Sequence, residues 1–119
     1  MRARYQGRDE FLNRQGIVQG GLLTAMLDNA MARALRLLIA DDIAIMSLEI
    51  KTSFIAPAPA GELFCEGQVV SHGKTSGFLE GRLFAPDGRL CTTASQTVRL
   101  IPLDIARSRS RNLTGQDKT

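Results

Sequence analysis

One aspartate in the middle of a helix-forming segment is the ionisable residue best suited to chemistry. Asp28 is the only charged residue between Gly20 and Ala32, and Thr24, one turn before it, is small and uncharged. A carboxylate buried without an ionic partner is costly, so such a residue usually has a function or a partner in a neighbouring chain. A solvated acid on an exposed helical face is the alternative. We treat Asp28 as a candidate general base or nucleophile and leave that choice open.

Two glycines, Gly20 and Gly21, come directly before the rest of the helical pattern. The first N–H groups of a helix have no partner within it and its dipole favours negative charge there, so this position can bind a carbonyl oxygen under attack. A tight turn from loop to helix would use the same glycines. Gly20 precedes Asp28 by about 12 Å along the helix axis, at 1.5 Å per residue. A ligand or a second chain must therefore bridge the two.

The sequence argues against several other kinds of site. His72 is the only histidine and lies in a predicted turn, which disfavours Ser-His-Asp and Cys-His arrangements. Cys65 and Cys91 are far apart in strand-like segments, so we expect buried thiols, not a zinc site or a disulfide. Gly73-Lys74-Thr75 is similar to the end of a phosphate-binding loop but lacks its upstream glycine and following helix. We expect no metal and no bound cofactor.

The helix that carries Asp28 is predicted to run from Gly20 to about Ala40. Alanine, leucine and methionine dominate this stretch, and all three favour helix. The apolar residues recur every three or four positions and form one stripe, from whose centre Asp28 points roughly 140° away. The predicted stripe consists of Leu22, Leu23, Met26, Leu27, Ala30, Ala34, Leu37 and Leu38.

The rest of the chain has the pattern of β-strands. Residues 45–55 alternate between apolar and polar, which places Met46 and Leu48 on a predicted buried face and Ser47 on the opposite one. Short glycine-containing links separate the later segments, as in antiparallel hairpins. The other predicted strands are Arg2–Gln6, Glu62–Ser71, Ser76–Ala85 and Arg89–Ile101.

An antiparallel sheet wrapped around one long helix, in the α+β class, is the economical arrangement of these elements. It is predicted to occupy residues 1–103 as one domain, followed by a polar, loosely ordered tail at residues 104–119. The sheet would have open edges, and Glu49 and Lys51 lie among apolar neighbours. Both features favour pairing with another copy of the chain.

The composition favours a globular protein of the cytosol. Of the 119 residues 44% are hydrophobic, and no apolar run reaches the ~20 residues that span a bilayer, so we expect no membrane association. Met1–Tyr5 is charged with no hydrophobic stretch behind it, which argues against a signal peptide. The net charge of +3, much of it in the tail at Arg107, Arg109 and Arg111, suits an anionic ligand but is too small to indicate nucleic-acid binding.

The residues before Asp28 resemble a known signature. Asn13–Gly21 reads Asn-x-x-Gly-x-x-Gln-Gly-Gly, with Asp28 seven residues later. This resembles the Asn-x-x-Gly-x-x-His-Gly-Gly motif, followed by Asp or Glu, of PaaI-like acyl-CoA thioesterases in the 4-hydroxybenzoyl-CoA thioesterase-like superfamily. The likeness continues through residues 47–58 and Gly73-Lys74-Thr75, and covers about residues 11–101.

The resemblance implies the hotdog fold, with sites at the interface of a homodimer or of a tetramer made from two dimers. It implies hydrolysis of an acyl-CoA thioester to the free acid and CoA. The Gly20 amide and the Asn13 side chain would hold the thioester carbonyl, while Asp28 would activate water or attack directly. Ser47 from the partner chain would orient that water. Further substrate contacts are implied for Gln19, Gly21, Gly73, Lys74 and Thr75.

Two features depart from the family pattern. Gln19 replaces the usual histidine, so it can position groups by hydrogen bonding but cannot shuttle protons near neutral pH. Simple alternation also turns Ser47 away from the predicted buried face. The acyl group is not specified, and Phe11, Leu35 and Phe54 are candidates to line its pocket. A non-catalytic acyl-CoA-binding or regulatory hotdog protein is the alternative function, whereas a hydratase is disfavoured because it would typically use a histidine.

Overall fold

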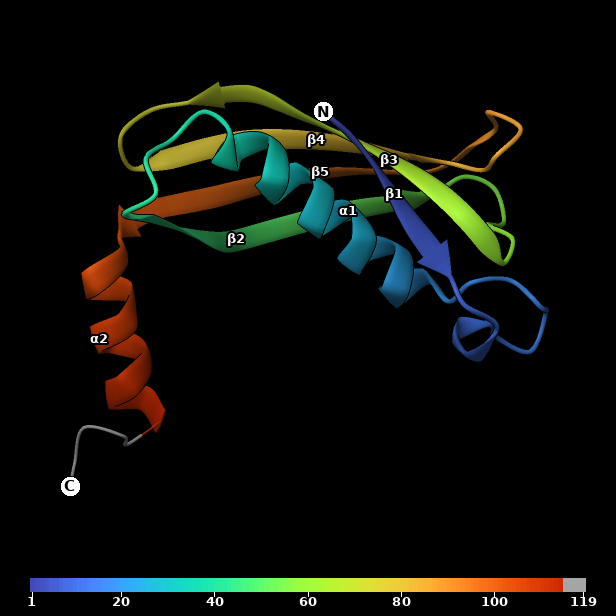
Figure 1. Ribbon diagram of the computed structural model, residues 1–119, viewed down its shortest axis with the longest axis horizontal. Helices are drawn as coiled ribbons and strands as arrows, with labels where there is room; N and C mark the ends of the chain where they lie inside the picture. The colour runs from blue at the N-terminus through green and yellow to red at the C-terminus, as the bar shows by residue number, and fades with distance from the viewer. Residues whose placement is uncertain (115–119) are drawn as a thin grey trace.

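A five-stranded antiparallel sheet lies against one long helix in the computed structural model, which describes residues 1–114 (Figure 1). The elements are β1 (Arg2–Gly7), η1 (Asp9–Phe11), α1 (Gly20–Arg36), β2 (Ile43–Phe54), β3 (Gly61–His72), β4 (Ser76–Phe84), β5 (Leu90–Pro102) and α2 (Leu103–Thr114). The strand order is β1-β3-β4-β5-β2, so β1 and β2 form the two edges. Helix α1 crosses one face and contacts every strand. The predicted α+β architecture is confirmed.

The buried stripe of α1 differs from the prediction. Its members are Leu23, Leu27, Ala30, Met31, Ala34 and Leu35. Leu37 and Leu38 are exposed because the helix ends at Arg36, before the predicted end near Ala40. The Arg36 guanidinium donates to the Ala40 carbonyl over 2.7 Å and holds the chain after the helix. Measured from the observed stripe, Asp28 is turned by only roughly 100°, so it flanks the buried face.

Strand β2 contains a bulge at Leu48 that reverses the alternation of its side chains. Ser47 and Glu49 pair with consecutive residues of β5, which leaves Leu48 without a partner. One extra residue shifts the alternation by one position, so Ser47 before the bulge and Ile50 after it both point towards α1. The predicted buried face is therefore wrong for Met46 and Leu48, which are 45% and 59% exposed.

The C-terminal segment contains a helix that was not predicted from the sequence. Residues 104–114 belong to α2, while residues 115–119 lie outside the described part of the chain. The N–H group of Leu103 donates to the carbonyl of Asp42 over 2.7 Å, which anchors α2 beside the start of β2. Figure 1 shows α2 projecting from the end of β5 past the edge strand β2. Within residues 1–114, no helix is long and apolar enough to cross a membrane.

Both cysteines lie in the sheet with their thiols free and buried, as predicted. Cys65 on β3 and Cys91 on β5 are part of the core between the sheet and α1. Burial raises the pKa of the Cys65 thiol to about 12. The thiol is therefore protonated, and inert as a nucleophile, near neutral pH.

Candidate active site

A cavity of about 340 Å³ lies where the N-terminus of α1 meets the segment after β2. Asn13 and Gly20 contribute to its wall, which is otherwise apolar. The apolar part consists of Ile17, Val18, Leu23, Phe54, Ile55, Ala56, Pro57 and Ala58. Of the three side chains predicted to line an acyl pocket, only Phe54 does so. Leu35 is buried in the core and Phe11 packs against it.

The loop that begins at Asn13 uses one end of the asparagine side chain. Its Oδ1 accepts hydrogen bonds from the N–H groups of Gln15 over 2.9 Å and Ile17 over 3.4 Å. Gly16 has a φ of 78°, in the left-handed region that favours glycine, which lets the loop close. Nδ2 of Asn13 donates to no protein group within residues 1–114. The loop therefore uses the Oδ1 acceptor of Asn13. It leaves the Nδ2 donor of this cavity-wall residue without a partner among residues 1–114.

The start of α1 supplies a second donor to the same wall. The N–H groups of Gly20 and Gly21 have no hydrogen-bond acceptor in the described chain, as expected for the first turn of a helix. The ring of Phe54 packs closely on Gly20: a Cβ added at Gly20 would lie 2.9 Å from the Cζ atom of the ring. Gly21 has open space around it. A side chain at position 20 would therefore require the ring of Phe54 to shift.

Gln19, the residue that replaces the family's histidine, fixes the loop through its backbone. Its N–H group donates to the carbonyl of Phe11 over 2.9 Å, and its own carbonyl accepts from Leu22 over 3.0 Å. Its side chain is exposed and makes no capping hydrogen bond to α1. Among residues 1–114, the Gln19 side chain therefore makes no hydrogen bond that orients the loop.

Asp28 lies at the centre of a small polar cluster between α1 and the sheet. Nε2 of Gln96, on β5, donates to Oδ1 of Asp28 over 2.6 Å and to Oγ of Ser47 over 2.5 Å. The Ser47 hydroxyl is 3.5 Å from the same Asp28 oxygen. Gln96 is only 4% exposed, whereas Asp28 is partly buried. A carboxylate, a hydroxyl and a buried amide thus meet in a single chain.

Within one chain, the hydroxyl of Ser47 already reaches Asp28. The role that the resemblance implies for Ser47 of a partner chain stays a prediction. The bulge at Leu48 makes the contact within the chain possible, since without it the alternation would turn the hydroxyl to the other face of the sheet.

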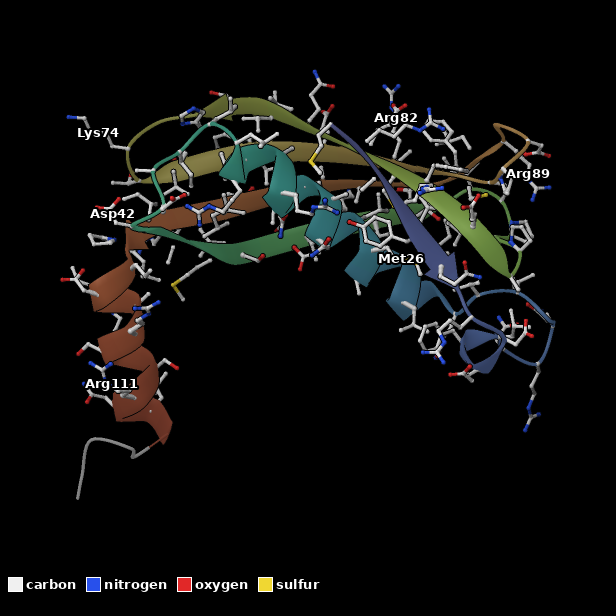
Figure 2. The ribbon with its side chains drawn as sticks, in the orientation of Figure 1. Met26, Asp42, Lys74, Arg82, Arg89 and Arg111 are labelled. Carbon is white, nitrogen blue, oxygen red and sulfur yellow. The ribbon has the colours of Figure 1, made fainter. Side chains whose placement is uncertain are left out.

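The turn Gly73-Lys74-Thr75 does not join the cavity of its own chain. Arg89 lies at the cavity end, where its guanidinium donates to the carbonyl of Pro57 over 3.0 Å. Figure 2 shows Lys74 at the opposite end of the molecule from Arg89. The predicted site residues therefore form three groups: the cavity wall with Asn13 and Gly20, the Asp28 cluster, and this distant turn.

Sequence reasoning missed Gln96, although a signal for it exists. The buried positions of β5 alternate as Ala94, Gln96, Val98 and Leu100. Glutamine is rarely buried without hydrogen bonds, so its place in an apolar row indicates a polar partner across the core. That partner is Asp28.

Comparisons with known proteins identify the family and the fold. The profile of the thioesterase superfamily matches residues 15–92. A phenylacetic acid degradation-related protein of Ralstonia eutropha JMP134 is 35% identical, over 82% of this chain and 74% of that one, with a TM-score of 0.78. The search of the curated proteins gave no match.

Two more distant structures share the fold. The PaaI protein of the E. coli phenylacetic acid degradation operon is 21% identical, over 84% of this chain and 71% of that one, with a TM-score of 0.76. A Streptococcus mutans UA159 protein bound to acetyl CoA is 17% identical, over 85% of this chain and 80% of that one, with a TM-score of 0.74. The chain therefore belongs to the thioesterase superfamily, as a PaaI-like protein with the hotdog fold, and is a thioester hydrolase.

Proposed function

We propose that this enzyme hydrolyses acyl-CoA thioesters to a carboxylic acid and free CoA. The observation that carries the proposal is a pair of unused donors, Nδ2 of Asn13 and the N–H group of Gly20, on residues in the wall of one apolar cavity. Donors of this kind stabilise the negative charge that develops on a thioester oxygen under attack. The Streptococcus mutans structure, which shares the fold, holds acetyl CoA.

Asp28 supplies the carboxylate for the chemical step. As a general base it removes a proton from water while the water oxygen attacks the carbonyl carbon. As a nucleophile it attacks that carbon itself, and water then cleaves the resulting anhydride. On either route the C–S bond breaks, CoA leaves as a thiolate, and the thiolate takes up a proton. Ser47, next to Asp28, is placed to orient the water.

A second copy of the chain completes the site. Gly20 and Asp28 are about 12 Å apart along α1, too far for one carbonyl carbon to meet both in a single chain. The outer edge of β2 has no neighbouring strand among residues 1–114. When β2 pairs antiparallel with β2 of a second copy, the two strands run in opposite directions. The Phe54 end of one strand then lies beside the Ile43 end of the other. Asp28 of one chain then faces Asn13 and Gly20 of the other.

This arrangement also explains the substrate contacts implied for the Gly73-Lys74-Thr75 turn. The turn lies far from its own cavity (Figure 2), at the end of the molecule that antiparallel pairing brings near the partner's cavity. Lys74 would then contribute a positive charge close to the CoA phosphates. Two such dimers can associate further into a tetramer.

The cavity favours small or medium acyl groups. Its volume of about 340 Å³ is near the lower end of ligand pockets, which hold roughly 300–1,000 Å³. Phe54 in its wall suits an aryl group as well as an aliphatic one. The proposed chemistry needs neither a metal nor a cofactor besides the CoA of the substrate, and the two unpaired thiols suit the reducing cytosol.

The test is hydrolysis of a panel of short, medium and aromatic acyl-CoAs by wild type and Asp28→Asn. We expect turnover by wild type and a loss of roughly 100-fold or more in Asp28→Asn, because the amide can neither accept the proton nor attack. Equal rates in the two proteins would remove Asp28 from the mechanism. Tight CoA binding without turnover of any substrate would favour a binding protein instead.

A further inference from the structure

We propose that Gln96 is a positioning residue: its side-chain amide holds one oxygen of the Asp28 carboxylate and thereby reserves the other, Oδ2, for the chemical step. The inference rests on the proposed role of Asp28 in acyl-CoA hydrolysis. It concerns a residue on β5 that is outside the family signature and contributes to neither the cavity wall nor the helix N-terminus.

Both hydrogens of the Gln96 amide are used inside the cluster. Nε2 donates to Asp28 Oδ1 over 2.6 Å and to Ser47 Oγ over 2.5 Å. A primary amide has two N–H donors, so these two bonds account for its whole donor capacity. Because Gln96 is 4% exposed, the amide cannot turn away from Asp28 without leaving buried donors unpaired.

The carbonyl oxygen of the same amide shows what determines this orientation. Oε1 of Gln96 is buried and has no hydrogen-bond partner within residues 1–114. Turning the amide over would bring Oε1 against the Asp28 carboxylate, where two acceptors repel each other. Leaving a buried acceptor unpaired costs free energy, which a stronger hydrogen bond of the same amide can offset. The charge-assisted hydrogen bond to ionised Asp28 is that stronger bond.

The two oxygens of Asp28 are consequently unequal. Oδ1 accepts from Gln96 and has the Ser47 hydroxyl 3.5 Å away, whereas Oδ2 has no donor within the described chain. Among residues 1–114, Asp28 forms no ion pair, so the amide and the hydroxyl are the groups that hold its charge. Oδ2 is therefore the oxygen left to meet a water molecule or a thioester carbon.

The first experiment replaces Gln96 by methionine, which keeps the size of the side chain and removes both donors. We expect kcat to fall roughly 10- to 100-fold, because a carboxylate free to rotate loses its alignment with the reacting atoms. KM for the acyl-CoA should change by less than about threefold, because the cavity and its donors are untouched. Thr92→Val is the matched control, since Thr92 also has a buried, unpaired side-chain oxygen on β5 but does not touch Asp28. It should keep the wild-type kcat.

A double-mutant cycle separates positioning from general structural support. In an Asp28→Asn background, Gln96→Met should lower the residual rate no further, because the group on which it acts is gone. An unchanged kcat in Gln96→Met alone, or an equal loss in both backgrounds, would overturn the role of Gln96 and leave the proposed function standing. Equal rates for wild type and Asp28→Asn would remove the proposed function itself.

Gln96→Glu keeps the proposal testable if the methionine variant does not fold. The introduced carboxyl group can donate to Asp28 only while it is protonated, and once ionised it repels the neighbouring carboxylate. We expect kcat of this variant to fall as pH rises, whereas the wild-type rate should not fall over the same range, because the amide of Gln96 does not ionise. Parallel pH profiles for the two proteins would contradict the proposal.

Discussion

The backbone carbonyl of Ala30 on α1 lies directly against Gly67 on β3. A Cβ added at Gly67 would lie 2.8 Å from the carbonyl carbon of Ala30 and would overlap its oxygen. Gly81, the cross-strand partner of Gly67 on β4, stands 3.1 Å from Met31 by the same measure. These two glycines let the helix lie close on the sheet, and that closeness sets the depth at which Asp28 meets the polar groups of β2 and β5.

Gly67→Ala should therefore destabilise the fold. The added methyl group would clash with backbone atoms of Ala30, which cannot move aside as the end of a side chain can, so the helix must lift from the sheet. We expect the free energy of unfolding, measured by urea denaturation, to fall by about 1–3 kcal/mol. Gly73→Ala is the matched control, because no atom lies within 4 Å of its added Cβ. A loss of the same size in the control would show that the close approach is not the cause.

Asn13→Asp should separate the donor of the cavity wall from the loop that carries it. The carboxylate keeps an oxygen that accepts from Gln15 and Ile17, so the loop and the melting temperature should be preserved. The variant lacks Nδ2, and its negative charge opposes the charge that develops on the thioester oxygen. We expect kcat/KM for acyl-CoA to fall roughly 100- to 1,000-fold. A loss of less than about threefold would exclude Nδ2 as a donor to the reacting carbonyl.

Much of the fold could be predicted from the sequence because it depends on local periodicity. The helix start at Gly20, all five strands and the antiparallel meander of β3, β4 and β5 follow from apolar spacing and glycine-containing turns. The end of α1 is less readable, because Leu37 and Leu38 continue the apolar pattern after the helix has ended. The helix at Leu103–Thr114 was hidden by its polar composition, which is also typical of loosely ordered tails.

Only part of the Asp28 cluster could be predicted from the sequence, because its geometry depends on contacts between distant segments. The lack of charged neighbours singles out Asp28, but a β-bulge has no clear sequence signal, so alternation alone turns Ser47 the wrong way. Gln96 is 68 residues from Asp28, and only the sheet order brings β5 beneath the helix. The position of Gln96 in an apolar row of β5 could have indicated that it is buried. It could not have identified Asp28 as its partner.

Gly20→Ala should disturb the cavity through Phe54. The new methyl group would lie 2.9 Å from the ring, which must then shift within the cavity that it lines. We expect kcat/KM to fall by roughly tenfold or more, as for an ill-fitting methyl group in a substrate pocket. In Gly20→Ala/Phe54→Leu the smaller side chain makes room for the methyl group, so the combined loss should be smaller than the product of the single losses. Strict multiplication of the two losses would mean that ring and glycine act independently.

Stability should fall at alkaline pH through Cys65. Its thiol has a pKa of about 12 in the folded chain against 9.0 as a free group, because burial disfavours the thiolate. The contribution of the Cys65 thiol to the free energy of unfolding is complete below pH 9.0. It is lost as pH rises towards 12, since the unfolded chain then gives up a proton that the folded chain keeps. In urea unfolding across this range, Cys65→Ala should lose less stability than wild type. Burial also raises the pKa of Tyr5, which is present in both proteins. Only the difference in stability loss between wild type and Cys65→Ala therefore reports on the thiol. If the free energy of unfolding fell equally with pH in both proteins, the contribution of the Cys65 thiol would be excluded.

Two inactive variants should restore activity when they are mixed, if Asp28 of one chain works with Asn13 and Gly20 of another. Asp28→Asn and Asn13→Asp each destroy a different half of the site. In a hybrid dimer, the Asn13 of the first variant faces the Asp28 of the second, so one of the two sites is intact. Random exchange makes half of the dimers hybrid, and activity should recover to roughly a quarter of the wild-type value. The exchange needs mild denaturation and refolding, and either variant taken alone through the same treatment is the control. Each should stay inactive. A site built within one chain would leave the mixture as inactive as its components, because no exchange of partners could then unite the two halves.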